Sequence, residues 1–204
     1  AYEMAIGLVG SEMYIRDSPS LLTPHAKAKK MMLWFGMISM TMMFAGLTSA
    51  YVVSKSRPDW LENFVLPVSF YVSTAVIVLS SITFWLAFKN LKDKKNFVLI
   101  YLTATLILAI IFSFFQWLGF GEIVSQGYYF TGSESTVTTS FLYVLVITHF
   151  AHLIAGIVIL IFVIVKYIKR KYFDKPLGFV LAHTFWHFLG FLWLYLFLFL
   201  FFLR

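Results

Sequence analysis

Long apolar stretches alternate with short polar segments along the whole chain. An α-helix needs about 20 apolar residues to cross the hydrocarbon of a bilayer, and five stretches meet this requirement: Met31–Ser54, Val65–Phe88, Phe97–Phe120, Ser140–Val165 and Phe179–Leu203. At a rise of about 1.5 Å per residue, each would be long enough to span with some tilt. The pattern predicts an all-α, polytopic membrane helix bundle with five transmembrane helices over residues 31–204, preceded by an N-terminal segment, residues 1–30.

The composition agrees with a membrane location. Hydrophobic residues make up 61% of the 204 residues and charged residues only 12%, whereas a soluble domain has about a quarter of its residues charged. The chain has no cysteine, which excludes disulfides and thiolate metal sites. No signal peptide is expected, because the first long apolar run is too long for one and no cleavage site follows it.

The basic residues predict an orientation. Thirteen of the sixteen Lys and Arg residues lie in the N-terminal segment, in the polar connection between the second and third spans, and in the one between the fourth and fifth spans. The other three are Lys55, Arg57 and Arg204. Cytoplasmic segments of membrane proteins are enriched in Lys and Arg. The distribution therefore predicts a cytoplasmic N-terminus and an external C-terminus, and it explains the positive charge without a nucleic-acid partner.

Polar groups inside the apolar stretches are few, and most of the candidates for chemistry among them are histidines. No Asp or Glu falls within the five predicted spans, which argues against a transporter that carries protons on buried carboxylates. Four of the five histidines lie in the last two spans, where each pair shares a helix face with a glycine: His149, His152 and Gly156, then His183, His187 and Gly190. A glycine on such a face lets a neighbouring helix approach closely.

Three interpretations of these histidines compete. The spacing is compatible with a membrane di-iron oxygenase, since imidazole suits iron, but such sites need more histidines and no carboxylate is available. The second interpretation is a haem held between the two helices. In the third, the imidazoles are neutral and bond backbone, lipid headgroups or each other across a helix pair. The residues favour the structural interpretation, with the oxygenase and a small transporter as alternatives.

The last span carries a fairly specific motif. The segment Trp186-His187-Phe188-Leu189-Gly190-Phe191-Leu192-Trp193-Leu194 resembles the last helix of subunit III of haem-copper terminal oxidases, which typically reads Trp-His-Phe-x-Asp-x-x-Trp-Leu. The resemblance extends over all five spans in order. Its other elements are the His149, His152, Gly156 pattern, Gln116 near the end of the third span, and Gly36-Met37, Phe44-Ala45-Gly46 and Ala50-Tyr51 in the first. The best-known members have seven helices, and this chain resembles forms without the first two.

The chain departs from the family at three acidic positions. Members often carry a carboxylate four residues before Phe-Ala-Gly, another after the glutamine and a third after Trp-His-Phe. This chain has Met40, Gly119 and Gly190 there. Any proton or lipid-amine role of those acids cannot be transferred to this chain.

The resemblance implies a non-catalytic subunit with helices grouped around a lipid-filled cleft in a bacterial-type cytoplasmic (inner) membrane. It implies no catalytic, cofactor or metal residue in this chain, with haem and copper in partner subunits of a respiratory complex that reduces oxygen with electrons from cytochrome c or quinol. The expected partners are the catalytic subunit I, other oxidase subunits and phospholipids, with a respiratory supercomplex as a further candidate. Supporting proton uptake is part of the implied role. Structural, lipid or subunit contacts are expected of His149, His152, Gly156, His183, Trp186, His187, Gly190, Trp193 and Gln116.

Overall fold

The computed structural model describes residues 24–56, 67–91, 95–127, 137–169 and 177–203. These residues form five helices: α2 (Pro24–Ser54), α3 (Val68–Lys89), α4 (Lys95–Ser125), α5 (Val137–Ile168) and α6 (Leu177–Leu203). All five are long and apolar enough to cross a membrane. The predicted all-α fold with five transmembrane helices is confirmed, whereas residues 1–23 of the predicted N-terminal segment lie outside the described residues.

Local sequence signals explain where the helices begin and end. α2 begins at Pro24, before the apolar run, so that Lys27, Lys29 and Lys30 are helical. α3 begins later than predicted because Pro67 is its N-cap residue, with an extended ψ of 141°, and proline suits a helix start. After α4, Gly127 has φ +84°, a left-handed conformation that glycine adopts without strain.

The helix that contains the third predicted span is longer than the span itself. α4 continues past Phe120 to Ser125 and includes Glu122. The carboxylate of Glu122 accepts a hydrogen bond from the hydroxyl of Ser69 at the start of α3. Ile123, the next residue, is buried, so the apolar face of the helix continues past the acid.

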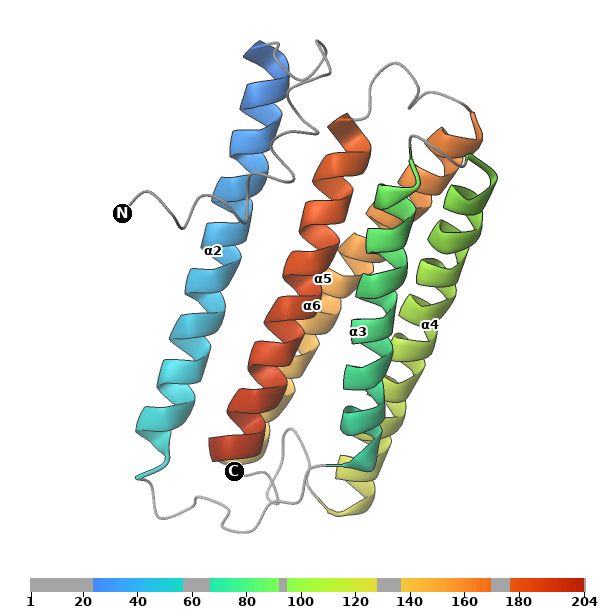
Figure 1. Cartoon of the computed structure of the whole chain (residues 1–204). Helices are drawn as coiled ribbons and strands as arrows, with labels where there is room; N and C mark the ends of the chain where they lie inside the picture. The colour runs from blue at the N-terminus through green and yellow to red at the C-terminus, as the bar shows by residue number, and fades with distance from the viewer. Residues whose placement is uncertain (1–23, 57–66, 92–94, 128–136, 170–176, 204) are drawn as a thin grey trace.

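Four of the helices form a closed ring to which the fifth is added. α3 packs on α4, α4 on α5, α5 on α6, and α6 returns to α3, while α2 packs on α5 and α6. Figure 1 shows α2 at one side of the molecule, next to α6 and away from α4. α5 and α6 therefore each contact three helices.

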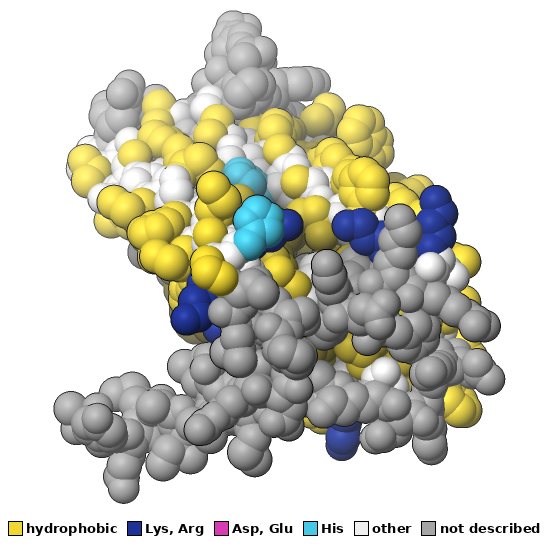
Figure 2. Space-filling view, turned by 90° about the horizontal axis from the view of Figure 1, so that it is seen from above, with side chains coloured by type: hydrophobic (Ala, Val, Ile, Leu, Met, Phe, Trp, Pro, Cys, Tyr) yellow, Lys and Arg dark blue, Asp and Glu magenta, His cyan; other side chains and the backbone are white. Residues whose placement is uncertain are grey.

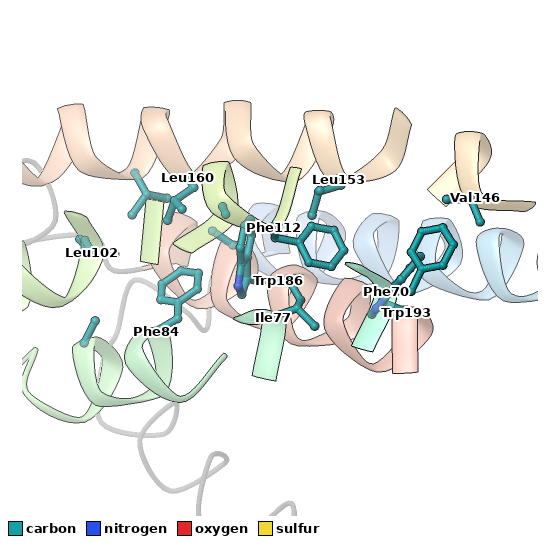
Figure 3. Close-up of a cluster of buried hydrophobic side chains, with 14 of the residues drawn as sticks. Phe70, Ile77, Phe84, Leu102, Phe112, Val146, Leu153, Leu160, Trp186 and Trp193 are labelled. Atoms are coloured by element: carbon teal, nitrogen blue, oxygen red, sulfur yellow. The ribbon is translucent and has the colours of Figure 1, made fainter. Parts of the chain in front are cut away.

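The interior of the ring is filled largely by aromatic and branched side chains. Trp186 and Trp193 of α6 are 2% and 1% exposed, and they lie among residues of the other three helices of the ring, including Phe84, Phe112 and Leu153. Figure 3 shows the two indoles along α6 with Phe70 and Phe84 of α3 close by. Phe112 meets Trp193 edge-on, with ring centroids 5.4 Å apart, an arrangement that aromatic pairs favour.

Hydroxyl groups of α3 connect this helix to both of its neighbours. Toward α6, Ser80 accepts a hydrogen bond from Nε1 of Trp186 (3.2 Å) and Thr74 accepts one from Nε1 of Trp193 (3.0 Å). Toward α4, Ser73 accepts from Nε2 of Gln116 (2.9 Å). Hydroxyls between helices act as polar contacts in lipid, where apolar burial supplies little association energy. The α3 hydroxyl face comprises Ser69, Ser73, Thr74, Ser80 and Thr83.

We predict that Ser80→Ala destabilises the bundle by about 1 kcal/mol, because it leaves the buried Trp186 N–H without its acceptor. Thermal unfolding of the protein in mild detergent, followed by tryptophan fluorescence, measures the effect. Ser49→Ala is the matched control, since Ser49 is exposed on α2. Equal midpoints for the two variants would contradict a role for the α3 hydroxyl face in holding α6.

Candidate functional site

The two histidines of α5 have different environments. His149 is 1% exposed and is enclosed by rings from three other helices: Phe44 of α2 at 6.4 Å, Phe112 of α4 at 6.5 Å and Trp193 of α6 at 5.1 Å between centroids. Neither of its ring nitrogens has a hydrogen-bond partner among the described residues. His152 is half-buried, and its Nδ1 lies 2.7 Å from the carbonyl oxygen of Thr148 on its own helix.

The two histidines of α6 form a pair with each other. Nε2 of His183 and Nε2 of His187 are 3.0 Å apart, so one ring donates a hydrogen bond to the other. Both rings pack against phenylalanines of α3: His183 stacks on Phe88 at 4.5 Å between centroids, and Phe84 contacts both histidines. The pair is therefore a polar contact within one helix, covered by aromatic rings of the next.

The structure does not bring the four histidines into one centre. Among the described residues no hydrogen bond or ring contact joins the α5 histidines to the α6 pair, and Phe44 rather than another imidazole lies against both His149 and His152. The described part of the chain contains no group of three or more His, Cys, Asp or Glu side chains that could hold a metal ion. The donor set does not fit a di-iron site, which needs several ligands on each iron.

The glycines that share a helix face with the two histidine pairs lie where helices approach closely. A Cβ atom added at Gly156 of α5 would lie 2.6 Å from Cδ1 of Leu189 on α6, and Trp186 is the next neighbour. A Cβ added at Gly190 of α6 would lie 3.0 Å from Oγ of Ser81 on α3. Both glycines therefore leave room for a side chain of the adjacent helix.

Apolar side chains pack around two of the positions at which family members often carry an acid. A Cβ at Gly119 would lie 2.9 Å from Cε1 of Phe70, so the ring of Phe70 fills the space that a longer side chain would need. Met40 packs against the cluster of Met37, Phe185 and Leu189. At Met40 and Gly119, therefore, apolar side chains occupy the surrounding space.

Gln116 connects the candidate residues to the α3 hydroxyl face. It is 1% exposed, its amide nitrogen donates to Ser73, and its Oε1 has no partner among the described residues. Ser73, Thr74, Ser80 and Glu122, the partners of Gln116, Trp193, Trp186 and Ser69, were not predicted as site residues. For the three hydroxyl residues, the available signal was their recurrence on one face of an otherwise apolar stretch.

Comparison with known proteins found relatives of one kind along most of the chain. Cytochrome c oxidase subunit 3 of Bacillus sp. (strain PS3) is 29% identical over 183 residues, which are 86% of each chain. Cytochrome c oxidase subunit 3 of Alkalihalophilus pseudofirmus is 27% identical over 94% of both chains. A probable quinol oxidase subunit 3 of Staphylococcus haemolyticus is 25% identical over 86% of this chain and 89% of its own. No protein-family model matches the chain.

Along most of its length the chain is similar to third subunits of haem-copper oxidases. Each relative is matched over most of its own length, so the subunit III likeness covers the bundle as a whole rather than one motif. The Trp-His-Phe motif of the chain lies on α6, where Trp186 bonds Ser80 of α3 and His187 bonds His183 of the same helix. Trp186 therefore links α6 to α3, whereas the bond of His187 stays within α6.

We predict that His149→Leu raises the stability of the bundle by about 1–3 kcal/mol, because leucine removes buried polar atoms without protein partners while filling a similar volume. The thermal midpoint in mild detergent should rise. His152→Leu is the comparison, since its ring is half-buried and bonds the Thr148 carbonyl, and no such rise is expected. A lower midpoint for His149→Leu would show that its imidazole makes a polar contact in the assembled protein.

Proposed function

We propose that this chain is the non-catalytic third subunit of a respiratory haem-copper oxidase, a complex that reduces oxygen to water with electrons from cytochrome c or a quinol. In this role it packs on the catalytic subunit I, binds phospholipid and supports proton uptake. Haem and copper belong to the partner subunits. The observation that carries the proposal is the similarity, over at least 80% of the chain, to third subunits named for cytochrome c oxidases and for quinol oxidases.

The geometry of the bundle supports a structural role. Its buried polar groups are largely used between helices, as with Ser73 and Gln116, or within a helix, as with His152. The side chains on its outer surface are mainly apolar, and α2 in particular is buried on only one side, by α5 and α6. A bundle of this kind offers broad helix surfaces to lipid and to other transmembrane subunits.

We further propose that the N-terminal end of α2 faces the cytoplasm. The described Lys27, Lys29, Lys30, Lys89, Lys166 and Lys169 belong to helix ends that lie together at the top of Figure 1, whereas Lys55 and Glu122 lie at the opposite end. Seen from the top, lysine side chains lie around this face, and no acidic side chain is visible there among the residues that are described (Figure 2). Under the positive-inside rule, this basic end is cytoplasmic.

The proposed function predicts which proteins accompany this chain. When the tagged chain is purified from membranes in mild detergent, a haem-bearing subunit should elute with it, with the absorption spectrum of the oxidase haems. The expected ratio of the two subunits is one to one. Purification of the chain without haem, under conditions in which it remains folded, would contradict the proposal.

Removing the chain should leave the redox centres intact. We predict that an oxidase depleted of it keeps its haem spectra and its initial rate of oxygen consumption but loses activity progressively during turnover, because the chain stabilises and does not react. Oxygen uptake followed over time in depleted and complete complexes measures this. A complex whose first turnovers fail while its haem spectra remain normal would place this chain in the electron path or the chemistry.

The orientation is tested with single cysteines, for which the cysteine-free chain provides a clean background. We predict that Gln126→Cys, just beyond α4, reacts with a membrane-impermeant thiol reagent added to intact cells, and that Lys169→Cys, just beyond α5, reacts only after permeabilisation. Both residues are exposed. The reverse pattern of labelling would invert the proposed topology.

A further inference from the structure

A groove runs between α3 and α6 on the outer surface of the bundle. Its volume is about 380 Å³, and its walls include Val78 and Trp85 of α3 and Phe191 and Leu194 of α6. Gly190 lies between these walls, and because it has no side chain, the surface of α6 is recessed there. Phe191 is 73% exposed and Trp85 is 49% exposed, so the groove opens toward the surroundings of the bundle rather than into its core.

The lining of the groove selects an apolar occupant. Most of its residues are aliphatic or aromatic, and the polar ones are Ser81 and His187. Nε2 of His187 is already engaged by His183. A polar solute would lose its hydration there and meet only the side chains of Ser81 and His187 as polar groups, whereas a hydrocarbon chain would bury apolar surface against both helices.

A positive charge lies at one end of the groove. Trp85 is the lining residue of α3 nearest the lysine-rich end of the bundle, and Lys89 follows it one helical turn later. Nζ of Lys89 lies 5.4 Å from the centroid of the Trp85 ring. Lys89 is exposed, so its ammonium group is open to a ligand anion while the tryptophan joins it to the apolar groove.

The length of this surface matches one half of a bilayer. Lys89 follows Val78 by eleven positions in α3, or about 16 Å along the helix axis. One leaflet contributes about 15 Å of hydrocarbon. A lipid whose phosphate meets Lys89 therefore has its chain terminus near the far end of the groove.

We propose that the α3/α6 groove is a binding site for an anionic phospholipid of the leaflet at the lysine-rich end, with one acyl chain between Val78 and Leu194 and its phosphate against Lys89. This inference rests on the proposed function in that the chain acts within a membrane complex, and it assigns the lipid a defined position. The site is more than annular contact because shape and charge coincide: the groove accepts the chain and Lys89 favours the negative headgroup.

The test measures lipid contact at Trp85. The chain, together with whatever subunits accompany it, is placed in nanodiscs of phosphatidylcholine. One sample contains a minor fraction of phosphatidylglycerol that is brominated in its acyl chains, and the other contains the same fraction of brominated phosphatidylcholine. Bromine quenches nearby tryptophans, and subtracting the signal of Trp85→Phe isolates the contribution of Trp85. Brominated phosphatidylglycerol should quench Trp85 about fivefold more effectively than brominated phosphatidylcholine at equal mole fraction, the preference expected from one lysine.

Two pairs of variants separate a site from general attraction. Lys89→Gln should abolish the preference for phosphatidylglycerol, while Lys166→Gln, which removes the same charge at the same end of the bundle, should retain it. Val78→Phe, which fills the groove, should reduce quenching by both lipids, while Ile161→Phe on the exposed surface of α5 should not. Equal quenching by the two lipids in the unaltered protein, or equal loss in Lys89→Gln and Lys166→Gln, would overturn the proposal.

The same preparation distinguishes this inference from the proposed function. If no haem-bearing subunit accompanies the chain but the Lys89-dependent preference persists, the oxidase role fails and the lipid site stands. If haem is present and the preference is absent, the lipid site fails and the oxidase role stands.

Discussion

The interhelical hydrogen bonds of α3 are the interactions on which the rest of the bundle depends. In lipid, apolar side chains are solvated equally well by neighbouring helices and by acyl chains, so close packing and polar contacts must decide which helices associate. α3 supplies such contacts in two directions: Ser73 toward Gln116 of α4, and Ser80 and Thr74 toward the tryptophans of α6. The ring of four helices closes through α3, and the positions of Trp193 and His149 follow from that closure.

The interior also contains a polar group that these bonds do not serve. His149 lies in contact with Trp193 and Phe112, and no described residue bonds its nitrogens. An imidazole in such a position is more costly to bury than a hydrocarbon side chain. Its ring does, however, meet aromatic side chains of α2, α4 and α6, so at His149 α5 contacts three helices at once.

The helices could be predicted from the sequence because a membrane span imposes a strict physical requirement, about twenty apolar residues with every backbone group bonded internally. The contacts between helices could not be predicted from the sequence. A serine or threonine in a span can bond the carbonyl four residues earlier, as Thr41 and Ser113 do, or a neighbouring helix, as Ser80 does, and these alternatives look the same in the sequence. Helical spacing likewise placed each histidine pair on one face, but not the distant Phe44 and Trp193 that enclose His149.

The peripheral position of α2 has a consequence for how proteins of this architecture can change in length. α2 contacts only one side of a ring that α3, α4, α5 and α6 complete among themselves. Helices gained or lost ahead of α2 would leave every contact within that ring unchanged, and a newcomer would meet a surface that carries Phe35, Met42 and Val53. The N-terminal side of the architecture is therefore the place where evolution can lengthen or shorten the chain without having to rebuild the core.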